Sequence, residues 1–179
     1  MNFDVKQFIN EHCITKDFPV KGVKFVDIFP LVRKFGLNDV VEFYNFPEPI
    51  VFVPEARGFI FMDVIGAHKC IPIRKEGKLP GELLSYSSTK EYGTDQMFFQ
   101  KSALEELINE DHGKVHEVVF FDDLLATGGT AQSFVDFIEK LNLHGHTFKV
   151  TRCCFYVELT ALKGRNKITV PVESVYRYE

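Results

Sequence analysis

The sequence of 179 residues contains no tryptophan and no excess of basic charge. No apolar stretch approaches the roughly 20 residues that cross a bilayer, and the N-terminus shows no basic segment followed by an apolar one. We therefore expect no membrane partner and a cytoplasmic location. The formal net charge of -4 argues against a nucleic-acid partner, because phosphate neutralisation needs lysine and arginine in excess along one face. A small anionic ligand is still compatible with this charge where cations gather locally.

Cysteine and histidine are also sparse. Cys13, Cys70, Cys153 and Cys154 follow neither the CxxC spacing of a metal site nor a disulfide framework, so we expect reduced thiols. The six histidines form no HExxH pair, which leaves a zinc hydrolase without support.

The composition is that of an ordinary globular protein, with 45% apolar and 26% charged residues. The length suits one domain over residues 1–179. Nineteen phenylalanines predict a core filled largely with Phe.

Strand-like and helix-like stretches alternate, which predicts an α/β fold with a mostly parallel sheet flanked by helices. Apolar runs predict strands at 50–53, 70–73, 118–121 and 150–157. Helices are predicted at 59–68, 102–110 and 132–141. The last of these has the spacing of a buried stripe, at Phe134, Phe137, Ile138 and Leu141.

Residues 75–100 interrupt the alternation, because glycine and proline stand among Ser, Lys and Thr there. Long irregular inserts in compact domains are usually functional or disordered. We therefore predict a flexible lid over 75–100, with a hairpin between 83–86 and 97–100.

The segment 118–134, VVFFDDLLATGGTAQSF, holds the most informative pattern. A buried strand ends in two carboxylates, Asp122 and Asp123, at the edge where open α/β sheets bind ligands. A glycine-rich turn then opens a helix. The turn consists of Ala126, Thr127, Gly128, Gly129 and Thr130. Its backbone N–H groups, its two hydroxyls and the positive helix end can meet one phosphate.

This loop is neither a Walker A loop nor a GxGxxG turn. Paired carboxylates would repel a nucleotide's phosphate chain, but they can accept hydrogen bonds from the 2- and 3-hydroxyls of a sugar. The pattern therefore favours a pentose 5-phosphate. The alternative is an acidic strand end with a Gly-Gly turn that binds nothing.

The same segment resembles the signature of the type I phosphoribosyltransferases, and DDLLATGGT is the wording of their adenine-specific branch. Other segments resemble that branch in the right order, namely KDFPVKGVKFVDIFPLV, PEARGF, IPIRKEGKLPG, SYSSTKEYGTDQ, VELTALKGR and the terminal YE. The resemblance implies the type I phosphoribosyltransferase fold, with a twisted sheet and a small N-terminal hood at 1–35. It also implies transfer of the phosphoribosyl group of phosphoribosyl pyrophosphate to N9 of adenine, giving AMP and pyrophosphate.

In the resembling family, the segment that matches PEARGF binds pyrophosphate. Arg57 is therefore expected at the leaving group, with Mg2+ held mainly by substrate oxygens and water. The peptide that matches Glu55–Ala56 is often cis, and both residues are expected to contact substrate. Pro54 stands where glycine is common, which leaves the loop backbone open. The alternative for Arg57 is an arginine at a helix start.

Arg74, Lys75 and Lys78 match the family segment IRKEGKLPG and are expected near pyrophosphate, where a departing anion needs positive charge. From the residues alone, a solvated basic patch fits equally well. Family structures are dimers in which this region lies near the partner. The resemblance therefore implies a homodimer, in which one of these cations serves the neighbouring site.

The lid segment STKEYGTD carries Glu91 and Tyr92, which the resemblance places among the catalytic residues. The family's glutamate is proposed to give a proton to N7 of adenine. The alternative is a solvated loop glutamate.

Base recognition in the family uses backbone groups near the segment that matches GVKFVD. Carried over, Lys24 and Val26 offer main-chain contacts, while Phe25 and Leu124 sandwich adenine. The alternative for Phe25 is a place in the core.

Two rival functions stay open. A guanine or xanthine phosphoribosyltransferase would want a side-chain donor for the C6 oxygen, and none is evident. A non-catalytic regulator would be expected to carry a DNA-binding segment, for which we see no room.

Overall fold

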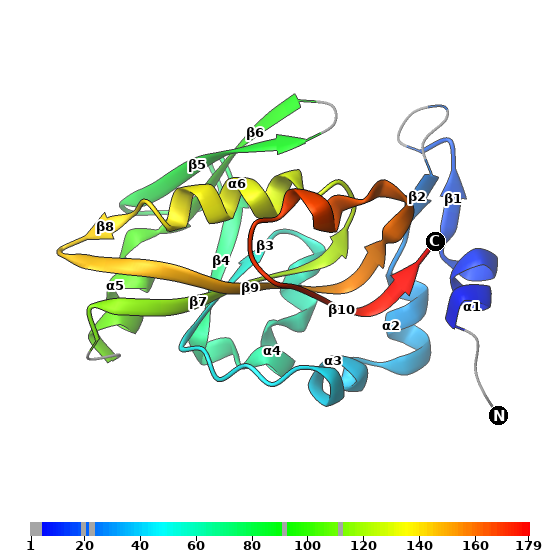
Figure 1. Ribbon diagram of the computed structural model, residues 1–179, viewed down its shortest axis with the longest axis horizontal. Coiled ribbons are helices and arrows are strands. Elements are labelled where there is room, and N and C mark those ends of the chain that lie inside the picture. Colours follow the sequence, from blue (N-terminus) through cyan, green and yellow to red (C-terminus); the bar gives the residue numbers. More distant parts are fainter. Residues whose placement is uncertain (1–4, 19–20, 22–23, 91–92, 111–112) are drawn as a thin grey trace.

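The computed structural model describes residues 5–18, 21, 24–90, 93–110 and 113–179, with only the backbone of Lys24, Thr89 and Lys90. An eight-stranded sheet runs through the molecule in the order β10-β9-β7-β3-β4-β6-β5, with β8 paired to β9 (Figure 1). Its strands are β3 (Ile50–Pro54), β4 (Cys70–Lys75), β5 (Leu83–Lys90), β6 (Gly93–Gln100), β7 (Val115–Leu125), β8 (Asn142–Leu143), β9 (His146–Leu159) and β10 (Val172–Tyr178).

The strands from β10 to β4 pair in parallel, whereas the β5–β6 hairpin and β8 add antiparallel pairs. The prediction of a mostly parallel sheet is confirmed. All four predicted strand positions are occupied, and the strand predicted at 150–157 extends in both directions to form β9.

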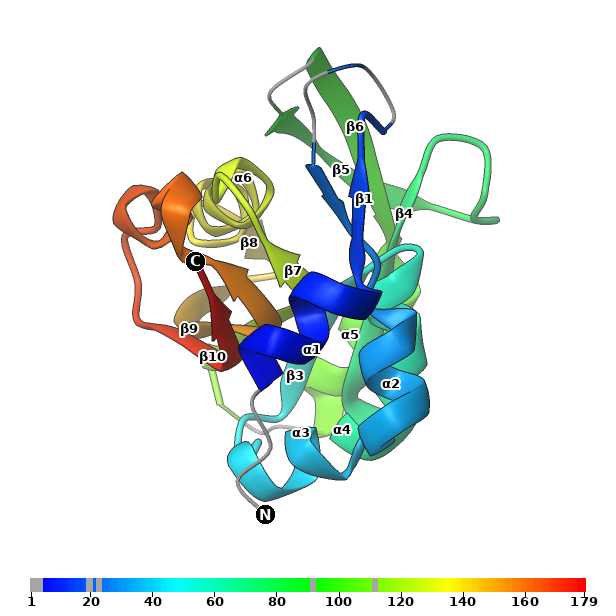
Figure 2. The same cartoon turned by 90° about the vertical axis from the view of Figure 1, so that its right-hand side faces the viewer.

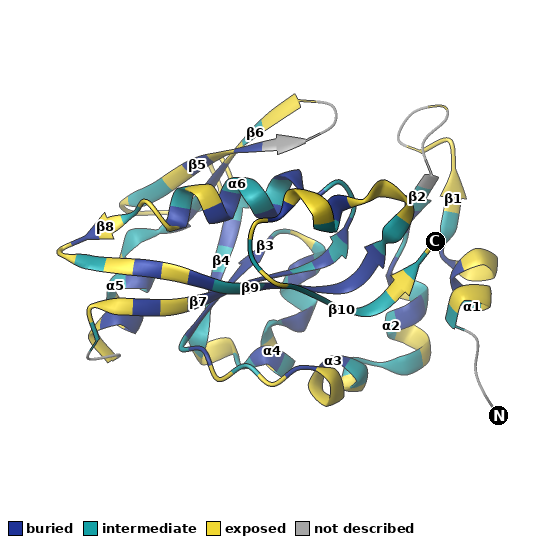
Figure 3. Ribbon diagram, viewed as in Figure 1, coloured by how far each residue is buried: buried dark blue, intermediate teal, exposed yellow. Residues whose placement is uncertain are grey.

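Helices cover both faces of the sheet. They are α1 (Val5–His12), α2 (Phe29–Phe35), α3 (Asn38–Phe43), α4 (Met62–Ile65), α5 (Lys101–Glu110) and α6 (Gly129–Ile138). Successive strand side chains point to opposite faces, so Ile50 and Phe52 pack with α5 and α6, while Val51 and Val53 pack with α1–α4. The strands β3 and β7 are buried along most of their length (Figure 3).

Two of the three predicted helices are confirmed. The helix predicted at 102–110 is α5, and the one predicted at 132–141 is α6, which begins and ends three residues earlier. Phe134 and Ile138 are fully buried, and Phe137 and Leu141 pack against the same core. Phe134 contacts the Phe52 and Phe120 rings, as the phenylalanine content predicted.

The single helix predicted at 59–68 is wrong. The chain instead forms a 3-10 helix η1 (Arg57–Phe61), the one-turn α4, and a second 3-10 helix η2 (Ala67–Lys69). Gly66 has φ +112°, which no helical residue adopts, and this ends the helix after Ile65.

The segment 75–100 is more regular than predicted. The predicted hairpin is present, but each strand has eight residues, and β5 packs along α6 through the Tyr86 ring, whose centroid lies 5.5 Å from that of Phe137. The two-stranded ribbon β1 (Ile14–Lys16) and β2 (Lys24–Val26) rises from the same side of the molecule as this hairpin (Figures 1 and 2). The division into hood and lid stays a prediction.

All four cysteines are free thiols, which confirms that prediction. Among the described residues, no helix is both long and apolar enough to cross a membrane.

Candidate active site

The loop after β7 leaves its backbone donors available. β7 ends at Leu125, residues 126–128 form a bend, and α6 begins at Gly129. Gly128 has φ +76°, a left-handed conformation that side chains rarely adopt. The backbone N–H of Gln132 donates to the Gly128 carbonyl, and within the described residues no turn or cap hydrogen bond engages the N–H groups of residues 127–130. These donors, at the positive end of a helix, suit an anion.

Asp122 and Asp123 lie within β7, three and two residues before its end at Leu125, because the strand predicted at 118–121 continues past them. The Asp123 N–H donates to Asp122 Oδ1 at 2.8 Å. Burial raises the pKa of Asp122, and the charge of Asp123 raises it further. Burial also raises the pKa of Asp123, against the opposing effect of the Arg57 guanidinium. A hydrogen-bond donor or a cation would therefore stabilise the charged form of either carboxylate.

One oxygen of this pair has spare capacity. Asp123 Oδ2 is buried and, within the described part of the chain, accepts no hydrogen bond. Arg57 Nε lies 2.8 Å away as an ion-pair partner, but without an aligned N–H. A buried acceptor is costly unless a donor fills it, and a sugar hydroxyl could do so.

Arg57 connects the N-terminal ribbon to the sheet. It begins η1 directly after the Glu55–Ala56 peptide, which is cis, as the resemblance implied. Its Nη1 donates to the Val26 carbonyl at 3.0 Å, and its Cζ lies 5.1 Å from the centroid of the Phe25 ring. Arg57 is therefore held by Asp123, Val26 and Phe25 together, which argues against a simple helix-start arginine.

The Glu55 carboxylate pairs with two of the three predicted cations, Arg74 and Lys78. Its side chain is 5% exposed, with Arg74 Nε 2.9 Å from Oε2 and Lys78 Nζ 3.2 Å from Oε1. The Lys75 N–H donates to Oε1 at 3.0 Å. Burial acts to raise the pKa of Glu55, but the hydrogen bonds from Arg74, Lys75 and Lys78 outweigh it and lower the pKa. This convergence on one buried carboxylate does not fit a loose solvated patch.

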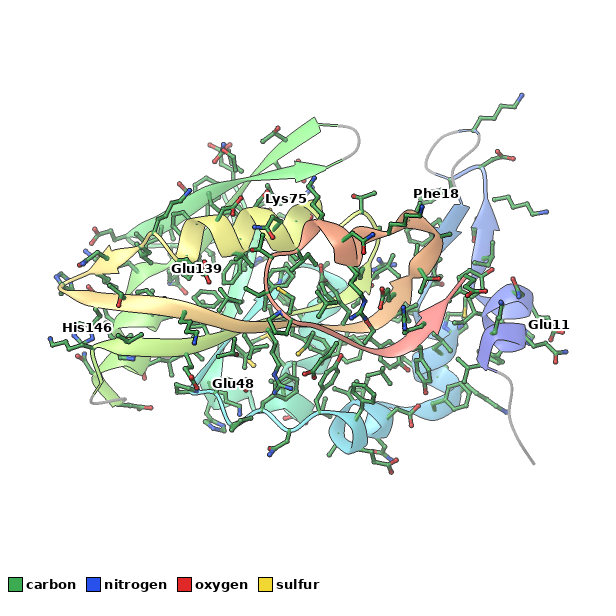
Figure 4. The ribbon with its side chains drawn as sticks, in the orientation of Figure 1. Glu11, Phe18, Glu48, Lys75, Glu139 and His146 are labelled. Carbon is green, nitrogen blue, oxygen red and sulfur yellow. The ribbon has the colours of Figure 1, made fainter. Side chains whose placement is uncertain are left out.

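The Lys75 side chain pairs with a different carboxylate, that of Asp95. Its Nζ lies 3.2 Å from Asp95 Oδ2 on β6, so it joins β4 to the hairpin. The side chain of Lys75 is labelled in Figure 4.

Several other predicted site residues either lie outside the described residues or are known here only by their burial and packing. Glu91, Tyr92 and the Lys24 side chain lie outside the described residues. Leu124 is half-buried and packs against the core cluster on the α1–α4 face, and Ala126, Thr127 and Thr130 are half-buried in the loop.

Sequence reasoning assigned no role to Gly164, which lies against the loop. A Cβ built on Gly164 would stand 2.1 Å from the Ala126 carbonyl oxygen. In the sequence, Gly164 was marked only by its place in VELTALKGR, one of the segments that resemble the family.

Comparison with known proteins supplies the family. No protein-family model matches the chain. An adenine phosphoribosyltransferase of Clostridium novyi is 37% identical over 177 residues, which cover 93% of this chain and 95% of the relative. The adenine phosphoribosyltransferase structure from Thermoanaerobacter pseudethanolicus matches with a TM-score of 0.74 at 34% identity, over 96% of this chain and 98% of that one.

A third match is the Saccharomyces cerevisiae adenine phosphoribosyltransferase, solved with adenine and an imino-altritol bisphosphate, with a TM-score of 0.69 at 28% identity over 95% of this chain and 97% of that one. Because these similarities extend over nearly the whole of each chain, this protein belongs to the adenine phosphoribosyltransferase family and has the type I phosphoribosyltransferase fold.

Proposed function

We propose that this chain transfers the 5-phosphoribosyl group of phosphoribosyl pyrophosphate to N9 of adenine, giving AMP and pyrophosphate. The observation that carries the proposal is the loop after β7, where available helix-end N–H groups adjoin the spare acceptor of Asp123. The relative solved with adenine and a bisphosphate contains ligands of the classes that we propose here.

The reaction assigns a task to each part of the site. The bond from C1 of the ribose to the pyrophosphate oxygen breaks, and its electron pair leaves with pyrophosphate. N9 forms the new bond to C1, and adenine loses one proton overall. We assign the 5-phosphate to residues 126–130, and the 2- and 3-hydroxyls to Asp122 and Asp123. Glu91 stays a prediction for proton transfer, and Tyr92 stays a prediction as a catalytic residue.

Pyrophosphate would compete for cations that are already paired. Arg57 is held by Asp123, and Arg74 and Lys78 by Glu55. A polyanionic substrate offers these cations more negative charge than a single carboxylate does, which favours an exchange of partners. The same exchange would free the face of Phe25 for adenine, opposite Leu124, because the Arg57 guanidinium now covers that ring.

Magnesium fits this site if substrate oxygens and water supply most of its ligands. Within the described residues, no group of three or more His, Cys, Asp or Glu side chains could hold a metal ion. The carboxylate oxygens of Asp122 and Asp123 are nevertheless of the kind that a hard cation prefers. When bound, Mg2+ would neutralise part of the pyrophosphate charge.

We also propose a cytoplasmic homodimer. The four free thiols suit a reducing compartment. The dimer rests on the family resemblance, and light scattering of the purified chain tests it. A monomer that retains full activity would refute a shared site.

Formation of AMP from adenine and phosphoribosyl pyrophosphate, with and without Mg2+, tests the proposed reaction. Guanine and xanthine serve as competing bases, and preference for either would favour that rival enzyme. Binding of phosphoribosyl pyrophosphate without turnover would favour the regulator.

A pair of matched variants ties the activity to the site. Asp123→Asn should lower kcat/KM for phosphoribosyl pyrophosphate by about ten-fold or more, since it removes a buried charge. Asp63→Asn makes the same chemical change on an exposed side chain of α4 and should leave activity unchanged. Equal activity in both variants would contradict the assignment of Asp123.

A further inference from the structure

The backbones of Gly164 and the phosphate loop (residues 126–130) approach closer than any side chain permits. A Cβ on Gly164 would lie 2.1 Å from the Ala126 carbonyl oxygen and 2.9 Å from the Gly128 nitrogen. A Cβ on Gly128 would lie 2.3 Å from the Gly164 carbonyl oxygen. The obstructing atoms are backbone on both sides, so no side chain can move aside.

Space alone requires glycine at position 164. Gly128 also needs glycine for its left-handed φ, whereas Gly164 lies outside the left-handed region. Gly164 is buried at the start of the 3-10 helix η4 (Gly164–Lys167), which follows η3 (Thr160–Leu162). We call residues 160–169 the backing segment, because it lies against the loop.

An ion pair anchors the backing segment to the strand that neighbours β7. Arg165 Nε donates to Glu158 Oε1 at 3.0 Å, and Arg165 Nη2 donates to Oε2 at 2.6 Å. Glu158 is 2% exposed, and Ser174 donates to the same carboxylate at 2.8 Å. Glu158 pairs in register with Leu125, the last residue of β7 before the loop. The anchor therefore sits one strand away from the loop's own root.

A second tie joins the backing segment to α6. The Thr169 N–H donates to Gln132 Oε1 at 2.8 Å, and Gln132 Nε2 donates to Thr169 Oγ1 at 3.2 Å. Gln132 also donates its N–H to the Gly128 carbonyl in the first turn of α6. The backing segment is thus tied to β9, the strand beside β7, and to α6, which follows the loop.

We propose that Gly164 is a positioning residue for phosphate binding, and that the Glu158–Arg165 pair holds it in place. The inference rests on the proposed function, because it assigns the 5-phosphate to residues 126–130. An added methyl group must push the Ala126 carbonyl away, since real Cβ contacts stay beyond about 3 Å. The loop's N–H groups then move by a distance that misaligns a bound phosphate.

The test compares Gly164→Ala with Gly145→Ala. Gly145 has φ +85° and nothing within 4 Å of its Cβ position, so alanine strains the β8–β9 turn without touching the loop. Calorimetry measures the Kd for ribose 5-phosphate, and kinetics give KM for each substrate. Gly164→Ala should raise that Kd and the KM for phosphoribosyl pyrophosphate about ten-fold or more, with KM for adenine nearly unchanged. Gly145→Ala should lower Tm only.

A second variant keeps the proposal testable if Gly164→Ala does not fold. Arg165→Met removes the anchor without adding an atom beside the loop, and it should raise the same Kd and KM, with partial rescue by Arg165→Lys. A folded Gly164→Ala with wild-type Kd overturns the inference, as does an unaltered Kd in Arg165→Met if the first variant is unfolded. Failure of the wild-type chain to bind ribose 5-phosphate and to form AMP would instead refute the proposed function.

Discussion

Replacing Glu55 with glutamine tests whether its carboxylate gathers the site's cations. The change keeps the shape of a side chain that is 5% exposed, but it removes the charge facing Arg74 and Lys78. Hydrogen bonds to a charged group contribute about 1.5–3 kcal/mol each. The side chains of Arg74 and Lys78 are 35% and 48% exposed, so solvent screening reduces that value. We expect Glu55→Gln to lower the free energy of unfolding at neutral pH by about 2 kcal/mol.

The pH dependence separates charge from shape. Because the pKa of Glu55 is lowered from 4.5 in the folded chain, the unfolded chain binds its proton more readily. The stabilisation is therefore complete well above pH 4.5 and is lost as the pH falls through the folded pKa. The difference between wild type and Glu55→Gln should shrink at a pH near 4 and below.

Urea unfolding at both pH values measures this difference. Circular dichroism is the suitable signal, since the chain has no tryptophan. Glu76→Gln is the control, because it removes the same charge from an exposed position in the turn between Arg74 and Lys78. An equal loss of stability at both pH values, or in both variants, would refute the reasoning.

Two further predictions concern the core and the far end of the sheet. Phe134→Ala should lower the free energy of unfolding by about 3–5 kcal/mol in urea titrations, because the ring is fully buried against Phe52 and Phe120. Burial and the charges of Lys114 and His116 lower the pKa of His146 from 6.5, so Tm should fall as the pH drops below that value, and His146→Gln should weaken this dependence. His146 lies at the opposite end of the molecule from Phe18 (Figure 4), whose ring centroid is 5.1 Å from that of Phe25 in the candidate site, so adenine turnover should be unaffected by the substitution.

Local sequence patterns predicted those parts of the fold that depend on local physics. Apolar runs gave the central strands, and helical spacing gave α5 and α6, because long periodic segments bury one face wherever they pack. The helices α1, α2 and α3 were not predicted. Each is eight residues or fewer, and helices this short depend on tertiary packing rather than on propensity. The prediction of one helix at 59–68 was wrong for a related reason. Gly66 interrupts an apolar pattern that is otherwise helical.

The candidate site divides in the same way. The succession of a strand with paired carboxylates, a glycine turn and a helix could be predicted because it is continuous in sequence, although the strand runs past the carboxylates to Leu125. Contacts between distant segments could not be predicted, such as the Arg57 guanidinium over the Phe25 ring or the Glu55 carboxylate between Arg74 and Lys78. These contacts show which of the predicted cations already have a partner within the chain.

The phosphate loop shows most sharply why its own sequence is not sufficient. Its glycines permit a close approach, but the surface they approach is the backbone of Gly164, which a different part of the chain supplies. We therefore expect a variant that retains every residue of DDLLATGGT to misplace the loop when one methyl group is added at position 164. By contrast, enlarging the space beside Gly128 would not make a side chain acceptable there, because the left-handed φ would remain. Gly164 is therefore constrained by space alone, whereas Gly128 is constrained by space and by its backbone conformation. Gly128→Ala should stay defective in phosphate binding in any variant that accommodates Gly164→Ala.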